Sequence, residues 1–289
     1  MMDGRALMRG KILLMDGSIR ELLGLYGAPP DERALFDAPD TLASVYREFA
    51  EAGVDILSSL TLNANRFGLR PFGWEDKAYE TARSGAALTR RIADSVEKPL
   101  LVAGTIGQIR SGHLRKGSLI SQYKEQIRGL ADGGADLLHL RGFSRPSLAE
   151  CALEARDKCG CTLPVILTVE PLCPPLLPQI RLFCDRVAGR DLLAFGICGF
   201  YDRGATDLMR QVASFCRFPL VCCRDTEHGD ALTSHRERAE RLPRRLQLMA
   251  REGLLNIAGG NRGAFPSHLC GLRTAIGDLP PRKVPNFGF

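Results

Sequence analysis

PLLVAGT at residues 99–105, DLLHLR at 136–141 and PVILTVE at 164–170 are the three runs of this sequence that decide its fold. Each run is continuously apolar instead of alternating, as expected of a strand that is buried on both faces of a parallel sheet. Amphipathic segments at Gly117–Leu130 and Pro146–Lys158 separate the runs. This stretch therefore predicts parallel strands joined by helices.

The same alternation continues in both directions along the chain. We expect strands at Lys11–Asp16, Val54–Ser59, Pro99–Thr105, Asp136–Arg141, Pro164–Glu170, Leu192–Cys198, Pro219–Arg224 and Leu254–Ala258. We expect the helices that follow them at Thr41–Ala52, Trp74–Val96, Gly117–Leu130, Pro146–Lys158, Pro175–Val187, Thr206–Cys216, His235–Arg251 and Pro266–Ile276.

Eight strand–helix pairs in 289 residues predict an α/β fold, a single (βα)₈ TIM barrel, since such barrels take about 250 residues. A doubly wound open sheet is the rival interpretation. No low-complexity linker divides the chain, so residues 1–289 are expected to form one domain. The tail at 279–289 contains three prolines and is expected to lie on the surface.

The composition excludes several classes of protein. A net charge of +6 is mild, and acidic residues interrupt the arginines of the His235–Arg251 segment, so we expect no nucleic-acid partner. No run approaches about 18 apolar residues, so no membrane span is predicted. The amino terminus lacks the pattern of a signal peptide. Ten cysteines without such a signal indicate thiols in a reducing compartment, and we expect a cytoplasmic protein.

A barrel places its functional residues at the carboxyl ends of its strands. This rule selects Asp16 and Glu170 as catalytic candidates, because carboxylates among arginines tend to stay ionised and suit a general base or an ammonium ligand. It selects glycine amides of the turn before the last helix as a cofactor or phosphate cradle. It also selects polar and thiol side chains for substrate or anion binding. The cradle residues are Gly259, Gly260 and Gly263, and the binding residues are Thr61, Asn63, Arg141, Cys198, Arg224, Asn261 and Arg262.

Several motifs resemble those of the zinc-dependent homocysteine S-methyltransferases. They recur in the family's order over nearly the whole chain: Leu13–Ser18 (LLMDGS), Glu51–Ile56 (EAGVDI), Val102–Gly107 (VAGTIG), Gly133–Leu138 (GGADLL) and Asn256–Gly260 (NIAGG) followed by Gly263, Pro266 and His268. The resemblance implies the same barrel and an enzyme that methylates a thiol. It also implies three cysteines that bind zinc, which deprotonates the acceptor thiol.

The sequence departs from the family at each of those cysteines. Gly199 stands at the ligand position after strand six, and Asn261 and Arg262 replace the cysteine pair after strand eight. Arg141 stands where the family has a glutamate after strand four. A guanidinium about 4 Å from a dication would be repelled by several kcal/mol, so zinc is not expected and no metal ligand is assigned.

Two interpretations of the site remain open beside this one. The first is a rebuilt zinc site on Cys198 and the Cys222–Cys223 pair, with His228 as a further ligand. The second concerns the arginines, which either form an anion pocket or make salt bridges to Asp16, Glu170 or Asp225.

The resemblance therefore implies a homocysteine S-methyltransferase-like protein, with methyl transfer to a small amino-acid-like substrate by a zinc-independent route. The methyl group could be presented by a corrinoid protein, which would be a partner, while no cofactor is expected on this chain itself. In that case Asp16 would orient an ammonium group, and Arg141 or Arg262 a carboxylate. The alternative from another class is a non-catalytic or regulatory barrel that binds an anionic metabolite through its arginines.

Overall fold

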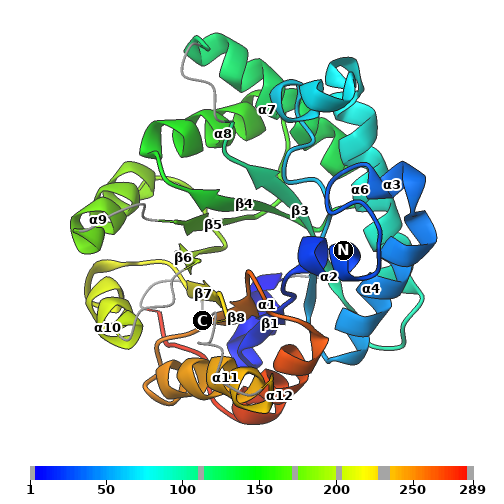
Figure 1. Cartoon of the computed structure of the whole chain (residues 1–289). Helices are drawn as coiled ribbons and strands as arrows, with labels where there is room; N and C mark the ends of the chain where they lie inside the picture. The colour runs from blue at the N-terminus through cyan, green and yellow to red at the C-terminus, as the bar shows by residue number, and fades with distance from the viewer. Residues whose placement is uncertain (1–3, 110–113, 171–174, 200–203, 227–234, 285–289) are drawn as a thin grey trace.

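The structure is a computed structural model and describes residues 4–109, 114–170, 175–199, 204–226 and 235–284. Eight parallel strands close into a barrel in sequence order, and helices surround it (Figure 1). The strands are β1 (Leu13–Met15), β2 (Ile56–Ser58), β3 (Leu101–Gly107), β4 (Leu137–Phe143), β5 (Val165–Val169), β6 (Ala194–Cys198), β7 (Leu220–Arg224) and β8 (Ile257–Gly260).

Closure of the barrel excludes the open sheet. Strand β1 pairs with β2 on one side and with β8 on the other, where Leu13 lies opposite Ile257 and Met15 opposite Gly259. The single (βα)₈ TIM barrel predicted from the sequence is thereby confirmed.

Each expected helix is present in the ring. These are α4 (Pro39–Glu51), α6 (Ala78–Asp94), α7 (Lys116–Asp132), α8 (Pro146–Lys158), α9 (Leu176–Val187), α10 (Ala205–Phe215), α11 (His235–Arg251) and α12 (Pro266–Ile276). The helix expected to begin at Trp74 begins instead at Ala78, after a 3₁₀ turn at Glu75–Lys77. The Trp74 ring packs edge-on against Phe36, with centroids 5.3 Å apart, and this contact accompanies the tighter turn.

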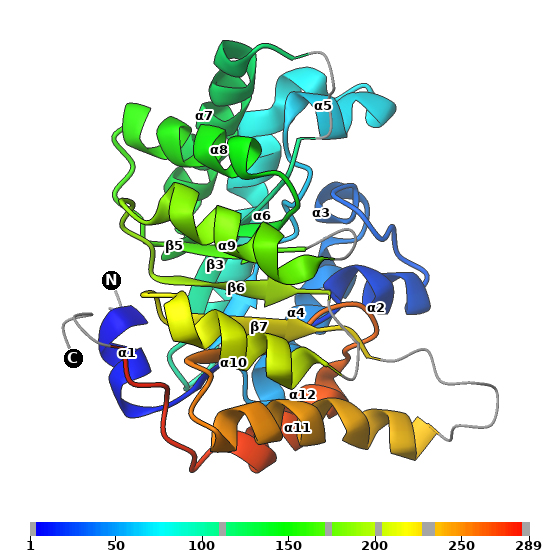
Figure 2. The same cartoon turned by 90° about the vertical axis from the view of Figure 1, so that its left-hand side faces the viewer.

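Short elements that the sequence did not predict cover the two ends of the barrel. They are α1 (Gly4–Gly10), α2 (Ile19–Leu25), α3 (Ala34–Asp37), α5 (Arg66–Leu69) and a 3₁₀ turn at Arg70–Phe72. Helix α1 lies at the amino-terminal end of the strands, whereas α2, α3 and α5 lie at the opposite end (Figure 2). The α1 residue Met8 is fully buried in the apolar cluster inside the barrel.

The core has two layers. Inward-facing side chains such as Leu13, Met15 and Ile56 fill the barrel, and a second cluster lies between strands and helices. The tail is less superficial than expected, because Arg282 and Val284 are buried. Among the described residues, no helix is both long and apolar enough to cross a membrane.

Candidate active site

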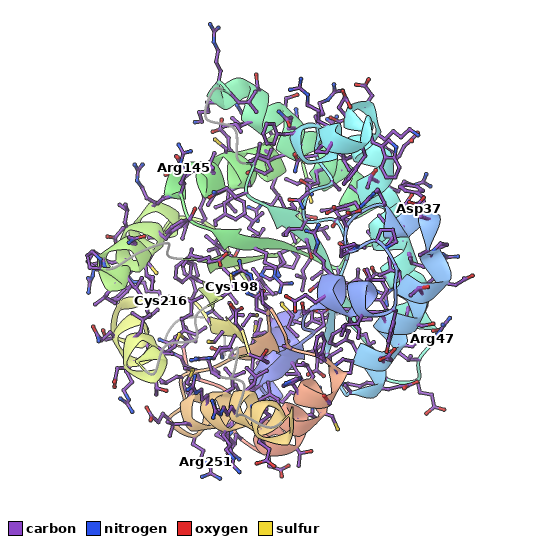
Figure 3. All side chains as sticks on the ribbon, in the orientation of Figure 1. Asp37, Arg47, Arg145, Cys198, Cys216 and Arg251 are labelled. Atoms are coloured by element: carbon purple, nitrogen blue, oxygen red, sulfur yellow. The ribbon has the colours of Figure 1, made fainter. Side chains whose placement is uncertain are left out.

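A cavity of about 420 Å³ opens at the carboxyl ends of the strands. Six residues selected from the sequence line it, namely Asn63, Arg141, Glu170, Cys198, Asn261 and Arg262. The labelled Cys198 lies inside the ring of helices, whereas Cys216 lies at its edge (Figure 3). Strand ends therefore bring together side chains from β4, β5, β6 and the loops after β2 and β8, as the barrel rule predicts.

The other selected residues lie behind the wall of the cavity. Thr61 is buried and donates its hydroxyl to the carbonyl of Thr105 at 2.9 Å. Arg224 is 2% exposed and lies at the end of β7. These two therefore support the walls and do not line the cavity.

Asp16 is completely buried at the end of β1, beneath the cavity. Its carboxylate accepts hydrogen bonds from the backbone N–H of Ser58 and, at 2.8 Å, from the Ser58 hydroxyl. Burial raises the Asp16 pKa to about 6, although Ser58 and the positive charge of Arg141 oppose the rise. The ionised form still dominates at pH 7, as expected from the sequence, but a proton can be held there a little below neutrality.

Glu170 and Arg262 form an ion pair across the mouth of the cavity. An Arg262 guanidinium nitrogen lies 3.1 Å from Glu170 Oε1. The Arg262 side chain is 60% exposed and the Glu170 side chain 24%, so this pair is partly screened by water. Of the two interpretations of the arginines, anion pocket or salt bridge, Arg262 therefore fits the salt bridge, with Glu170 as its partner.

Arg141 is held differently. Its guanidinium donates to Asn261 Oδ1 at 2.7 Å, and the Asn261 amide donates in turn to Asp225 at 2.6 Å. Among the described residues, Arg141 makes no ion pair, although its charge lowers the pKa of Asp16. A cation that lines a cavity and is bonded to a neutral amide retains donors for a carboxylate or phosphate ligand.

The glycine turn before α12 is not a preformed anion cradle, contrary to the expectation for Gly259, Gly260 and Gly263. The Gly260 N–H donates to the carbonyl of Asp16 at 3.0 Å, and the Gly263 N–H donates to Glu21 at 2.6 Å. Gly259 lies within β8, opposite Cys223. Close packing explains these glycines better, since a Cβ on Gly260 would lie 2.3 Å from that of Ala264.

Cys198 and Cys223 are neighbours on β6 and β7 and both face the barrel interior. Cys222 points the other way, into the outer cluster. Burial raises the pKa of Cys198 to about 12 and also raises that of Cys223, so both are thiols at neutral pH. His228 lies outside the described residues. No group of three His, Cys, Asp or Glu side chains suited to a metal occurs among the residues that the structure describes.

Comparison with known proteins identifies the family of this chain. The family model for homocysteine S-methyltransferase matches residues 13–276. The chain belongs to the homocysteine S-methyltransferase family. This confirms the resemblance seen in the sequence motifs, and the family is one of methyltransferases.

The sequence identity to individual relatives is low. The chain is 23% identical over 304 residues to methionine synthase of Mycobacterium tuberculosis. The match covers 98% of this chain but 25% of that protein, so this chain spans a quarter of the length of methionine synthase. The metallated form of homocysteine methyltransferase MmuM from Escherichia coli superimposes with a TM-score of 0.77 at 18% identity, covering 93% of this chain and 98% of that one. The apo form of MmuM gives 0.75. At such identities the structural match shows a shared fold.

Aligned by its motifs, this chain has Gly199, Asn261 and Arg262 at the three positions where the resemblance implies zinc-binding cysteines. Gly199 has a left-handed φ of 75°, and a Cβ built on it would lie 2.8 Å from Glu170 Oε1. Glu170 therefore occupies the space that a cysteine side chain would enter, and Arg262 pairs with that same carboxylate. This donor set does not fit zinc, because it puts a guanidinium and a glycine where thiolates are needed.

The sequence selection missed several cavity residues. Arg20 and Glu21 belong to α2, which was not predicted, and Ser58 was assigned to the body of a strand. Ser58 could have been found from alternation along β2, since Ile56 faces the barrel interior and Ser58, two positions later, lines the cavity.

Proposed function

We propose that this protein transfers a methyl group to a small amino-acid-like acceptor, of which homocysteine is the first candidate, without using zinc. The observation that carries the proposal is the Glu170–Arg262 ion pair beside Gly199. Family membership supports methyl transfer, and the charged pair in place of three thiolates supports a different way of activating the acceptor.

The charges of the cavity suit a zwitterionic ligand. Its wall carries the basic residues Arg20, Arg141 and Arg262 and the acidic residues Glu21 and Glu170, with Asp16 directly beneath. In this proposal Arg141 binds the carboxylate of the ligand, because it is bonded only to the neutral Asn261 amide among the described residues. Glu170, which lines the cavity, is better placed for the ammonium group than the buried Asp16.

The size of the cavity also fits the proposal. About 420 Å³ lies within the range of small-molecule sites, roughly 300–1,000 Å³. An amino acid would leave part of this volume free for a methyl donor entering from the mouth. The donor could be a small molecule or a methyl group presented by a corrinoid protein.

The test combines metal analysis with ligand binding. We expect the purified, reduced protein to contain zinc only at background and to bind L-homocysteine in a calorimeter. Arg141→Ala should weaken binding at least tenfold, whereas Arg145→Ala, an exposed neighbour outside the cavity, should not. Near-stoichiometric zinc would instead support a rebuilt site on Cys198 and Cys223, and absence of homocysteine binding would contradict the proposal.

A non-catalytic barrel that holds an anionic metabolite is the second candidate, and the same Arg141 donors favour it. Thermal shifts with phosphate, succinate and L-homocysteine separate the two. A larger shift with a dianion than with the amino acid, together with no methyl transfer, would favour this second function.

A further inference from the structure

Ser58 connects the cavity to the buried Asp16. It is the last residue of β2, is 2% exposed and lines the cavity. Its hydroxyl donates to Asp16 Oδ1 at 2.8 Å, while its backbone N–H donates to the other carboxylate oxygen. Ser58 therefore links the cavity by a hydrogen bond to Asp16, which does not itself line the cavity.

The other carboxylates of the cavity wall are already engaged. Glu170 pairs with Arg262, and Glu21 accepts the N–H of Gly263 at 2.6 Å. Asp16 differs from both because it is completely buried and is held by one neutral residue. A carboxylate removed from water, with a hydroxyl between it and the ligand, is an arrangement suited to accepting a proton.

We propose that Ser58 passes a proton from an acceptor thiol bound in the cavity to Asp16 during methyl transfer. This inference rests on the proposed function, and it supplies the thiol activation that zinc provides elsewhere in the family. The thiol proton moves to Ser58 Oγ as the Ser58 hydroxyl proton moves to Asp16 Oδ1. The freed sulfur electron pair forms the S–CH₃ bond, and the bond between the methyl group and its donor breaks with its electrons left on the donor.

Proton affinities make the relay feasible. With a thiol pKa of about 8.5, transfer to an aspartate of ordinary pKa, about 3.9, would be disfavoured by about 40,000-fold. The Asp16 pKa of about 6 reduces this to about 300-fold, and the thiolate then formed is consumed by methylation.

The charged and titratable groups around Asp16 are compatible with this role. Arg141 of β4 lowers the Asp16 pKa and so keeps the base ionised at pH 7. Tyr46 of α4 and Cys223 of β7 also interact with Asp16, and burial raises the pKa of both, so they stay neutral where Asp16 titrates. A change in rate near pH 6 that disappears in Asp16→Asn therefore reports on Asp16.

The test uses iodomethane as a methyl donor, so that the natural donor need not be known. Methionine formation from L-homocysteine is followed at saturating amino acid between pH 5 and 8, and binding is measured separately by calorimetry. We expect the wild-type protein to accelerate the reaction and to lose rate below about pH 6 as Asp16 is protonated. After subtraction of the rate measured without protein, Ser58→Ala and Asp16→Asn should lower the rate constant by about 100-fold or more and remove the loss of rate near pH 6, with binding affinity nearly unchanged.

Two further variants separate the relay from a structural role. Ser58→Thr retains a hydroxyl and should restore both rate and pH dependence. Ser59→Ala alters the neighbouring residue, whose hydroxyl bonds to Thr61 at 2.6 Å, and should keep the pH dependence. Binding of homocysteine without acceleration, or an unchanged rate in Ser58→Ala, would overturn the relay alone. Failure of the wild-type protein to bind homocysteine would overturn the relay together with the proposed function.

Discussion

Gly199 shows at the level of one residue how little room the chain leaves at the carboxyl end of β6. Gly199→Cys would place a side chain on a backbone with φ of 75° and push its Cβ against Glu170. The left-handed backbone costs roughly 1–3 kcal/mol for a residue other than glycine, and the contact adds to it. We expect urea unfolding to show a loss of about 2–4 kcal/mol.

The contribution of Glu170 can be isolated in a double-mutant cycle. Glu170→Ala in the Gly199→Cys background should recover about 1 kcal/mol or more. Gly27→Cys is the matched control, because Gly27 is exposed, has a left-handed φ of 72° and has no atom within 4 Å of its built Cβ. Equal losses for the variants at 199 and 27 would contradict the crowding argument.

Burial also governs the reactivity of the cavity thiol. The Cys198 pKa of about 12 leaves almost no thiolate at pH 7.5, and thiolate is the reactive form. Iodoacetamide followed by peptide mass spectrometry should therefore modify the exposed Cys270 at least tenfold faster than Cys198. Faster labelling of Cys198 would indicate a thiolate in the cavity and revive the rebuilt-metal interpretation.

The sequence predicted the candidate site unevenly, for physical reasons. Arg141, Glu170 and Arg262 were found because they lie at or near the carboxyl ends of strands, and the barrel determines where strand ends meet. Asp16 and Thr61 also follow strands, yet their side chains turn away from the cavity to hydrogen-bond Ser58 and Thr105. Side-chain direction after a strand depends on tertiary contacts that a single sequence does not reveal.

At the scale of elements, the contact between α6 and α7 depends on glycines. A Cβ on Gly129 of α7 would lie 2.5 Å from the carbonyl of Tyr79 on α6. Gly129→Ala should therefore destabilise the protein by about 1–3 kcal/mol, as overpacking does. Gly117 lies near the start of the same helix with nothing within 4 Å of its built Cβ, so Gly117→Ala should be neutral or up to about 1 kcal/mol stabilising.

Thermal or urea unfolding of the two alanine variants provides the measurement. A similar change in both would mean that helix propensity, and not close approach, determines the effect of these glycines.

Elements were easier to predict from the sequence than side chains. All eight strands were found, because burial on both faces makes them continuously apolar, and the eight outer helices were found by their amphipathic pattern. The helices α2, α3 and α5 were missed because they have four to seven residues, too short for a periodic signal. Arg20 and Glu21 of the cavity were missed with α2.

At the scale of the whole molecule, the two ends of the barrel have different roles. The carboxyl end carries the cavity, while α1 and the tail cover the amino-terminal end. Stability and function should therefore be separable by substitutions at the two ends. Arg282 of the tail is the residue on which this separation can be tested.

Arg282 is buried and ties the tail to the barrel. Its guanidinium donates to the carbonyls of Ala213, Cys216 and Phe218, and its own carbonyl accepts from Asn256 at 2.8 Å. Burial lowers its pKa, which indicates that these carbonyls, and not water, solvate the charge. Arg282→Ala leaves the carbonyls without their donor and should cost roughly 2–5 kcal/mol.

The neighbouring Lys283 is exposed, so Lys283→Ala is the control and should change the free energy of unfolding by less than about 0.5 kcal/mol. Binding of L-homocysteine measured below the unfolding transition should be the same in both variants, because the cavity lies at the other end of the strands. Loss of binding in folded Arg282→Ala would show that the two ends of the barrel are coupled. Strand β7 could connect them, because Phe218, which accepts a hydrogen bond from Arg282, lies just before this strand and Arg224 is its last residue. Unchanged binding with lowered stability would establish that the tail secures the barrel without shaping the site.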